Sequence, residues 1–213
     1  MDLNKGRRNQ KRSYERFVVI MSFIFILLPL FLYLYNKIYD LFYVSYLIII
    51  EILIVMAIII RTDKEKLKFQ YSNNRLKIVL GIMNRKLNIV CDKVVLVHIE
   101  QYNNIYDVED FRIILLTTSK FRNNKIIKVN EKFLKLHDYA ANFYYKLKKI
   151  DPEKDFYYTI IKRGGLKKYY LLDTLYRTCV YAHFTEECIE KIKKLRKEMD
   201  IELAYMLILQ RNV

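Results

Sequence analysis

The residues with the most obvious chemical potential are Cys179, His183 and Cys188. Thiolates and imidazoles are the side chains that zinc prefers, and Cys179 and His183 would share a face if their segment were helical. A tetrahedral zinc site also needs a fourth ligand, and usually a close Cys-x-x-Cys pair, neither of which is evident here. We therefore expect no metal site, and interpret these residues as buried thiols beside a core or surface histidine.

Other catalytic signals are missing from the sequence. It has no Walker phosphate loop, dinucleotide-binding glycine motif, nucleophile elbow or zinc-protease helix motif. His98 lies in an alternating, strand-like segment, and His137 follows an apolar helix position, so both suit structural roles. We expect no catalytic residue and no cofactor; an enzyme acting at a membrane face ranks third among the functions considered.

Glu51 and Pro29 stand out because each lies inside a long apolar run. Residues 17–35 hold no charged side chain, and residues 41–60 hold only Glu51. About 20 helical residues cross a hydrocarbon core of roughly 30 Å, so both runs are predicted to span a membrane as a hairpin. A cleaved signal peptide is the rival explanation of the first run, but no small-residue cleavage site follows it.

A charge near the bilayer centre costs about 2.5–3.5 kcal/mol on insertion scales, so Glu51 needs an explanation. It could belong to an ion relay or a contact between subunits. Alternatively, it could be protonated and hydrogen-bonded to Ser22, Ser45 or a backbone carbonyl. Two helices are too few to enclose a pathway, which favours a structural or oligomer contact. Pro29 removes a backbone donor and is predicted to kink the first helix.

Basic residues set the expected topology. The first 16 residues include Arg7, Arg8, Lys11, Arg12 and Arg16, whereas the link at 36–40 has only Lys37. The positive-inside rule then places both termini in the cytoplasm, with the hairpin in the cell membrane. The same five side chains are candidates for contact with anionic lipid. Basic charge alone supports nucleic-acid binding only weakly, and we expect no nucleic-acid partner.

Beyond residue 60, the spacing of the apolar residues changes from that of strands to that of a helix. Apolar and polar residues alternate from 67 to 80, and strands are also predicted at 87–91, 93–100, 111–118 and 126–129. One amphipathic helix is then predicted to begin after the N-cap Asn130, with its apolar stripe from Phe133 to Ile150, and to stop at Asp151-Pro152. Six strands followed by a helix predict a small curved sheet or barrel.

Residues 67–149 resemble the bacterial pleckstrin-homology-like domain that follows a transmembrane hairpin in many small membrane proteins. The resemblance lies in Asn74-Arg75-Leu76-Lys77-Ile78, Gly81, Asn84-Arg85-Lys86, the valine-rich segment at 92–101 and the terminal helix. It implies a partly open β-barrel with a C-terminal helix, used for binding or assembly. The family shares no enzymatic activity and its ligands are mostly unknown, so the resemblance implies no particular binding residue.

Residues 151–213 extend beyond that resemblance. Apolar segments at 156–161 and 166–172 flank Gly164-Gly165 and predict a β-hairpin. A last helix is predicted to follow the N-cap Thr185. Its apolar stripe from Cys188 to Met206 suits the core better than a membrane surface.

Taken together, the chain is predicted to be a two-pass membrane protein with a cytoplasmic α+β part. Its 38 Lys and Arg and 23 Asp and Glu give a net charge of +15, while 53% of residues are hydrophobic. We predict a basic N-terminus (1–16), a transmembrane hairpin (17–60), a pleckstrin-homology-like domain (61–150) and an α+β extension (151–213). The expected function is that of a non-enzymatic binding or scaffold protein, with lipid around the hairpin and a protein partner or second copy of the chain. The alternative is a subunit of a larger membrane assembly for transport, secretion or envelope function.

Overall fold

A computed structural model describes residues 3–35, 41–103, 109–120 and 125–211, and only the backbone at 3–11, 103, 109 and 202–211. The chain divides into two compact units, residues 1–65 and 66–213.

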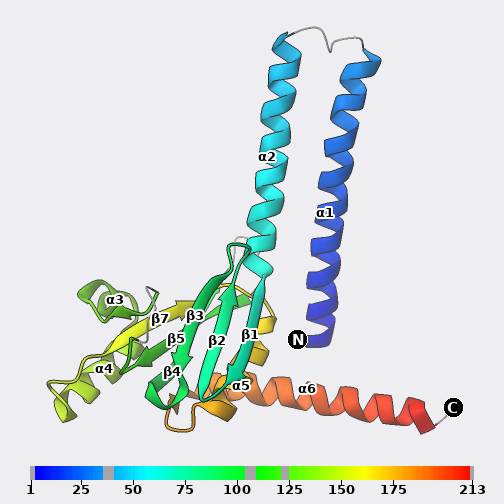
Figure 1. Cartoon of the computed structure of the whole chain (residues 1–213). Coiled ribbons are helices and arrows are strands. Elements are labelled where there is room, and N and C mark those ends of the chain that lie inside the picture. The colour runs from blue at the N-terminus through cyan, green and yellow to red at the C-terminus, as the bar shows by residue number, and fades with distance from the viewer. Residues whose placement is uncertain (1–2, 36–40, 104–108, 121–124, 212–213) are drawn as a thin grey trace. The chain divides into compact units, whose positions relative to one another are not determined.

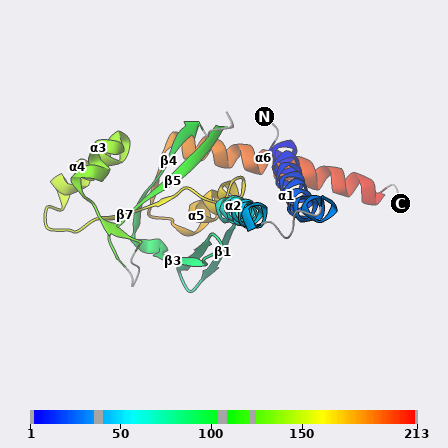
Figure 2. The ribbon, with the colours of Figure 1, turned by 90° about the horizontal axis from the view of Figure 1, so that it is seen from above.

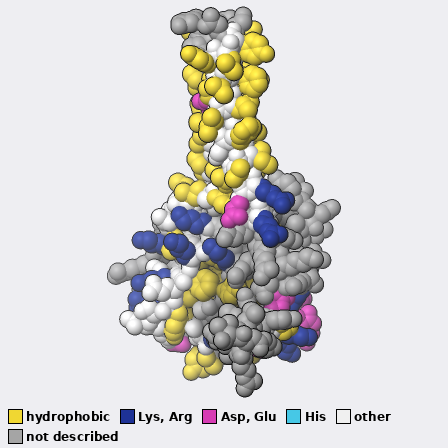
Figure 3. Space-filling view, turned by 90° about the vertical axis from the view of Figure 1, so that its right-hand side faces the viewer, with side chains coloured by type: hydrophobic (Ala, Val, Ile, Leu, Met, Phe, Trp, Pro, Cys, Tyr) yellow, Lys and Arg dark blue, Asp and Glu magenta, His cyan; other side chains and the backbone are white. Residues whose placement is uncertain are grey.

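The first unit is a pair of helices, α1 (Leu3–Leu34) and α2 (Leu41–Glu65), which lie side by side (Figure 1). The apolar stretches Arg12–Leu34 and Leu41–Glu65 are each long enough to cross a membrane, which agrees with the predicted spans. On the face drawn in Figure 3, hydrophobic side chains cover most of the described surface of the helix pair. Near the base of the pair, Tyr14 and Thr62 share a hydrogen bond of 2.9 Å, and the Arg61 guanidinium lies over the Phe17 ring. The predicted link at 36–40 lies outside the described residues.

The second unit contains two sheets. The three-stranded sheet is the meander β1 (Leu67–Ser72), β2 (Arg75–Leu80) and β3 (Arg85–Val90). The five-stranded sheet has the order β6-β7-β5-β4-β8. It consists of β4 (Val94–Asn103), β5 (Glu109–Thr117), β6 (Ile127–Lys128), β7 (Tyr157–Ile161) and β8 (His183–Phe184). All the strands are antiparallel to their neighbours except β8, which is parallel to β4.

The six strands predicted before residue 130 are therefore confirmed, but they do not close into a barrel. Among the described residues, no ladder joins β3 to β4, because the short 3-10 turn Cys91–Lys93 separates the two sheets. The edge of β5 is taken by β7, which comes from beyond residue 150 and lies between β5 and β6. The segment expected to be an extension thus completes the larger sheet.

Helices cover both faces of the five-stranded sheet (Figure 2). On one face, α3 (Glu131–Leu136) and α4 (Asp138–Ile150) pack through Phe133 and Ala140 onto Leu96, Ile114 and Leu116. On the other face, α5 (Lys167–Thr178), the first turns of α6 (Glu186–Arg211) and the three-stranded sheet enclose the larger core.

Two predicted elements differ from the structure. The helix predicted from Phe133 to Ile150 is broken at His137, whose backbone (φ −136°, ψ 75°) is not helical. Asn130 caps its first part, since its side chain accepts a hydrogen bond of 2.9 Å from the Phe133 N–H.

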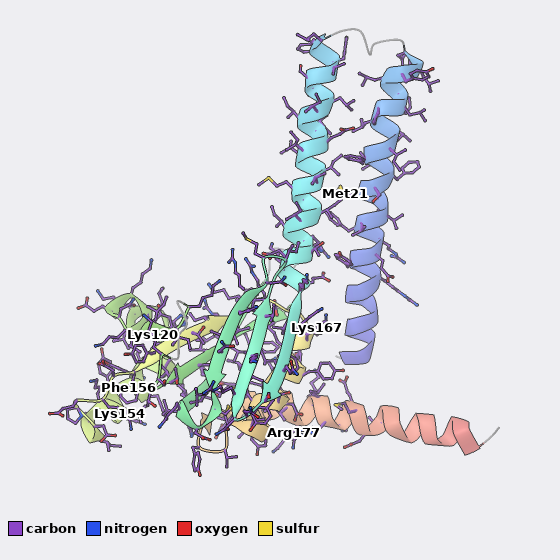
Figure 4. All side chains as sticks on the ribbon, viewed as in Figure 1. Met21, Lys120, Lys154, Phe156, Lys167 and Arg177 are labelled. Carbon is purple, nitrogen blue, oxygen red and sulfur yellow. The ribbon has the colours of Figure 1, made fainter. Side chains whose placement is uncertain are left out.

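The second strand of the predicted hairpin at 156–172 is wrong: this segment is helix α5. Its buried residues Lys168, Leu171, Leu172 and Leu175 follow a helical spacing of three and four rather than a strand alternation. The Gly164-Gly165 pair leads into the helix, because the Lys167 N–H donates to the Gly164 carbonyl at 2.9 Å. Figure 4 labels Lys167 and Arg177 near the two ends of α5.

Candidate functional site

The outer face of the three-stranded sheet carries a group of exposed cations. The alternation of β1–β3 turns Leu76, Ile78 and Leu87 into the core and leaves their neighbours outside. We call this outer surface the basic face; its charged residues are Lys68, Arg75, Lys77 and Lys86, all exposed.

The register of the strands spaces these cations across the sheet. Lys68 and Lys86 both lie opposite Val79 of the middle strand, so their backbones are about 10 Å apart. Lys77 lies two residues before Val79 on that strand and therefore occupies the same face. Such an open, pleated surface suits an extended row of carboxylates or phosphates rather than one enclosed small molecule.

The three lysines of the basic face have no acidic residue beside them on their own strands. Residues 67–90 include no Asp or Glu. Within the described part of the chain, no carboxylate forms an ion pair with Lys68, Lys77 or Lys86. Exposed ammonium groups without a local partner raise the positive potential of a surface and attract polyanions.

A second group of charges is buried inside the unit, around Lys168 at the start of α5. This side chain is fully buried, and its Nζ donates to the Asp110 carboxylate, to the Phe111 carbonyl and, at 3.3 Å, to the Lys162 carbonyl. The Asp110 carboxylate also accepts a hydrogen bond of 2.8 Å from the Tyr102 hydroxyl. Burial lowers the pKa of Lys168, and the Asp110 charge opposes that change.

A third polar group joins α3 and α4 to the sheet. The Glu100 carboxylate contacts His137 Nδ1 at 2.8 and 2.9 Å and Arg112 Nε at 2.8 Å. Nearby, His98 stacks on Tyr139 with 4.6 Å between ring centroids, and burial lowers the pKa of its imidazole. Because these groups pair with one another inside the domain, they link α3 and α4 to the five-stranded sheet.

Sequence reasoning missed both buried groups. Glu100 and Arg112 are direct cross-strand partners, as are Tyr102 and Asp110. Once the β4–β5 register is known, these pairings follow from it. Lys168 belongs to a segment predicted to be a strand. The sequence therefore did not indicate that its side chain is buried.

The three residues considered as metal ligands are not brought together. Cys179 contacts Cys91, Cys188 Sγ donates to the Val97 carbonyl at 3.4 Å, and His183 is exposed and stacks on Phe143. No group of three or more His, Cys, Asp or Glu residues in the described segments could hold a metal ion.

The residues singled out in the apolar runs both lie in the helix pair, Pro29 within α1 and Glu51 within α2. Glu51 is half-buried, and no hydrogen bond joins it to another described residue. The Ser45 hydroxyl, one of its predicted partners, donates instead to the Phe42 carbonyl at 2.9 Å.

The predicted lipid-contact residues Arg7, Arg8, Lys11, Arg12 and Arg16 all belong to α1. Arg12 and Arg16 are exposed, whereas the side chains of the other three lie outside the described residues.

Comparisons with protein-family models, with curated proteins and with solved structures found no match to this chain.

Proposed function

We propose that this chain is a membrane-anchored, non-enzymatic binding protein that holds an acidic partner protein at the cytoplasmic face of the cell membrane. In this proposal α1 and α2 cross the membrane, and residues 66–213 form the binding module. The observation that carries the proposal is the basic face, where the exposed lysines Lys68, Lys77 and Lys86 lie on three strands and no described carboxylate forms an ion pair with them. The resemblance of residues 67–149 to pleckstrin-homology-like domains supports a role in binding or assembly.

The experiment is site-specific photocrosslinking of the full-length protein in its native membranes. A photoreactive amino acid replaces Gln70, an exposed residue between the cations of the basic face, or Lys146, an exposed residue on α4. We expect a discrete crosslinked protein from position 70 and none from position 146. Added salt should weaken the crosslink, because exposed charges are screened over about 8–10 Å at physiological ionic strength.

A charge reversal completes the test. Lys68→Glu with Lys77→Glu should abolish the crosslink from position 70, whereas the matched pair Lys146→Glu with Lys149→Glu on α4 should leave it unchanged. An equal effect of the two pairs would show that net charge matters rather than the basic face. The same product from both crosslinking positions would refute a specific binding face.

The second candidate function is a subunit of a larger membrane assembly. Glu51 favours it, because this carboxyl group lies in an apolar helix and has no hydrogen bond to another described residue. A neighbouring helix could supply a partner for it. Glu51→Leu should then dissociate the complex on native gels, whereas Ile52→Leu at the next, exposed position should not. Survival of the complex in Glu51→Leu would remove this candidate.

A further inference from the structure

The turn between β2 and β3 is hydrogen-bonded to the residue that follows the second apolar helix. Helix α2 ends at Glu65 and β1 begins at Leu67, so only Lys66 separates them. The Gly81 N–H donates to the Lys66 carbonyl at 2.8 Å. One hydrogen bond therefore holds this turn, residues 81–84, to the residue that follows α2.

Helix length places that junction at the depth of the lipid headgroups if α2 spans the bilayer. Its 25 residues extend about 37 Å, several ångströms more than a hydrocarbon core of about 30 Å. The charged end of the helix, from Arg61 to Glu65, suits the polar region beyond that core. Because the turn is hydrogen-bonded to Lys66, the residue after the helix, it cannot lie far from the headgroup region.

The composition of the turn is amphiphilic. Met83 is 77% exposed at its tip, which is high for a large apolar side chain. The two residues that shape the turn, Gly81 (φ 71°) and Asn84 (φ 46°), have left-handed backbones. The exposed cations Arg85 and Lys86 follow directly, and the Arg85 guanidinium lies 3.8 Å from Met83 Sδ.

An exposed apolar tip beside cations has the chemistry of an interfacial lipid contact. The thioether enters the boundary between headgroups and acyl chains, while the cations remain among the lipid phosphates. Each Lys or Arg near an anionic leaflet is attracted to the lipid phosphates. A lipid surface, rather than a protein, is favoured as the occupant because the chain itself holds the turn near the end of α2.

We propose that the turn at 81–84 is a second membrane contact of this protein, with Met83 inserted into an anionic leaflet and Arg85 and Lys86 bound to lipid phosphates. This contact shares Lys86 with the basic face, but Met83 and Arg85 take no part in the proposed partner binding, and vesicles of pure lipid contain no partner protein. It would limit the rotation of the module, from Leu67 onwards, about Lys66, the one residue between α2 and β1. Figure 1 shows that the turn and the start of β1 lie at the same end of the three-stranded sheet.

The chain has no tryptophan, which allows a direct test with one introduced fluorophore. Full-length M83W is reconstituted in vesicles of phosphatidylcholine alone or mixed with phosphatidylglycerol, and brominated lipids serve as quenchers. The control is Y181W, because Tyr181 is a similarly exposed apolar residue (79%) in the loop after α5. We expect blue-shifted, quenched emission from M83W in the anionic vesicles, and water-like, unquenched emission from Y181W.

Charge reversal tests the anionic part of the proposal. Arg85→Glu with Lys86→Glu in the M83W protein should reduce the quenching in anionic vesicles severalfold. Equal quenching in the two lipid mixtures would overturn the role of the phosphates. Water-like emission of M83W in both lipid mixtures would overturn the membrane contact. If the emission then shifted only in native membranes, a protein rather than lipid would be the occupant of the turn. Loss of the photocrosslink at the basic face would leave this result unaffected.

Discussion

Lys168 and Asp110 form an ion pair inside the domain, although 58 positions separate them in the chain. The Lys168 side chain is fully buried. Strand β5 pairs with β7 only from Ile113 onwards, so the carbonyls of Phe111 and Lys162 lie just beyond the end of that ladder. The ammonium group donates to both carbonyls and thereby satisfies acceptors that the sheet leaves open.

We therefore expect Lys168→Ala to destabilise the protein by about 3–5 kcal/mol, because it leaves a partly buried carboxylate and two carbonyls without their donor. The exposed neighbour Lys167→Ala should change the stability by less than about 0.5 kcal/mol. Denaturant unfolding of the full-length protein in detergent, followed by circular dichroism, measures both values. Equal stability of the two variants would contradict a structural role of the ion pair.

Gly164 packs against Leu67 with no space for a side chain. A Cβ atom at this position would lie 2.5 Å from Leu67 Cδ2 and 2.7 Å from Leu67 Cβ, and the backbone φ is +115°. Gly164→Ala should therefore cost about 2 kcal/mol or more, through backbone strain and displacement of β1.

Gly165→Ala is the matched control, since φ is 47° there, in the left-handed region that other residues visit at a cost of about 1 kcal/mol. Unfolding midpoints compare the two variants. A Gly165→Ala protein less stable than Gly164→Ala would show that the contact with Leu67 is not the cause.

His98 should make the stability depend on pH. Burial lowers its pKa in the folded protein, while Glu187 and Glu100 oppose that change. The unfolded chain takes up a proton near the ordinary pKa of about 6.5, before the folded protein does. The stabilisation is thus complete above this value and is lost as the pH falls from there through the lowered pKa.

Thermal unfolding between about pH 7 and pH 5 should show a steeper fall for the unmodified protein than for His98→Asn, which cannot titrate in this range. His137 is present in both proteins, so the difference between the two curves reports His98. Parallel curves would mean that the folded and unfolded chains bind this proton equally.

Cys91 and Cys179 form a buried thiol pair. Hydrogen bonding with Cys179 and Thr178 lowers the pKa of Cys91 to about 7 against the opposing effect of burial, whereas the pKa of Cys179 is raised by its contact with Cys91. Diamide, which accepts two electrons and both thiol protons, should therefore join these two sulfur atoms in the full-length protein. Peptide mass spectrometry should detect the Cys91–Cys179 link, and Cys188→Ser should not reduce its yield.

Cys188 is the internal control for that experiment. Burial raises its pKa to about 11, and its Sγ is held by Thr185 and the Val97 carbonyl. A link through Cys188, or no link before the protein unfolds, would contradict the proposed proximity of Cys91 and Cys179.

The sequence by itself determined the features that depend on local spacing. The apolar runs predict the two helices long enough to span a membrane, and the short strand-like segments predict β1 to β7. The cap at Asn130 and the strand at 157–161 were also within reach, because each depends on residues a few positions apart.

Tertiary structure alone decided the remaining features. The segment Leu166–Leu172 has an apolar pattern short enough to fit a strand or a helix, and packing against β1 and α6 selects the helix. The placement of β7 beside β5, the ion pair of Lys168 with Asp110 and the contact of Cys91 with Cys179 join residues 40 to 90 positions apart. Periodicity reports which face of an element is apolar but not which distant element will cover it. The basic face became visible only once the strand register showed that its cations share one side of the sheet.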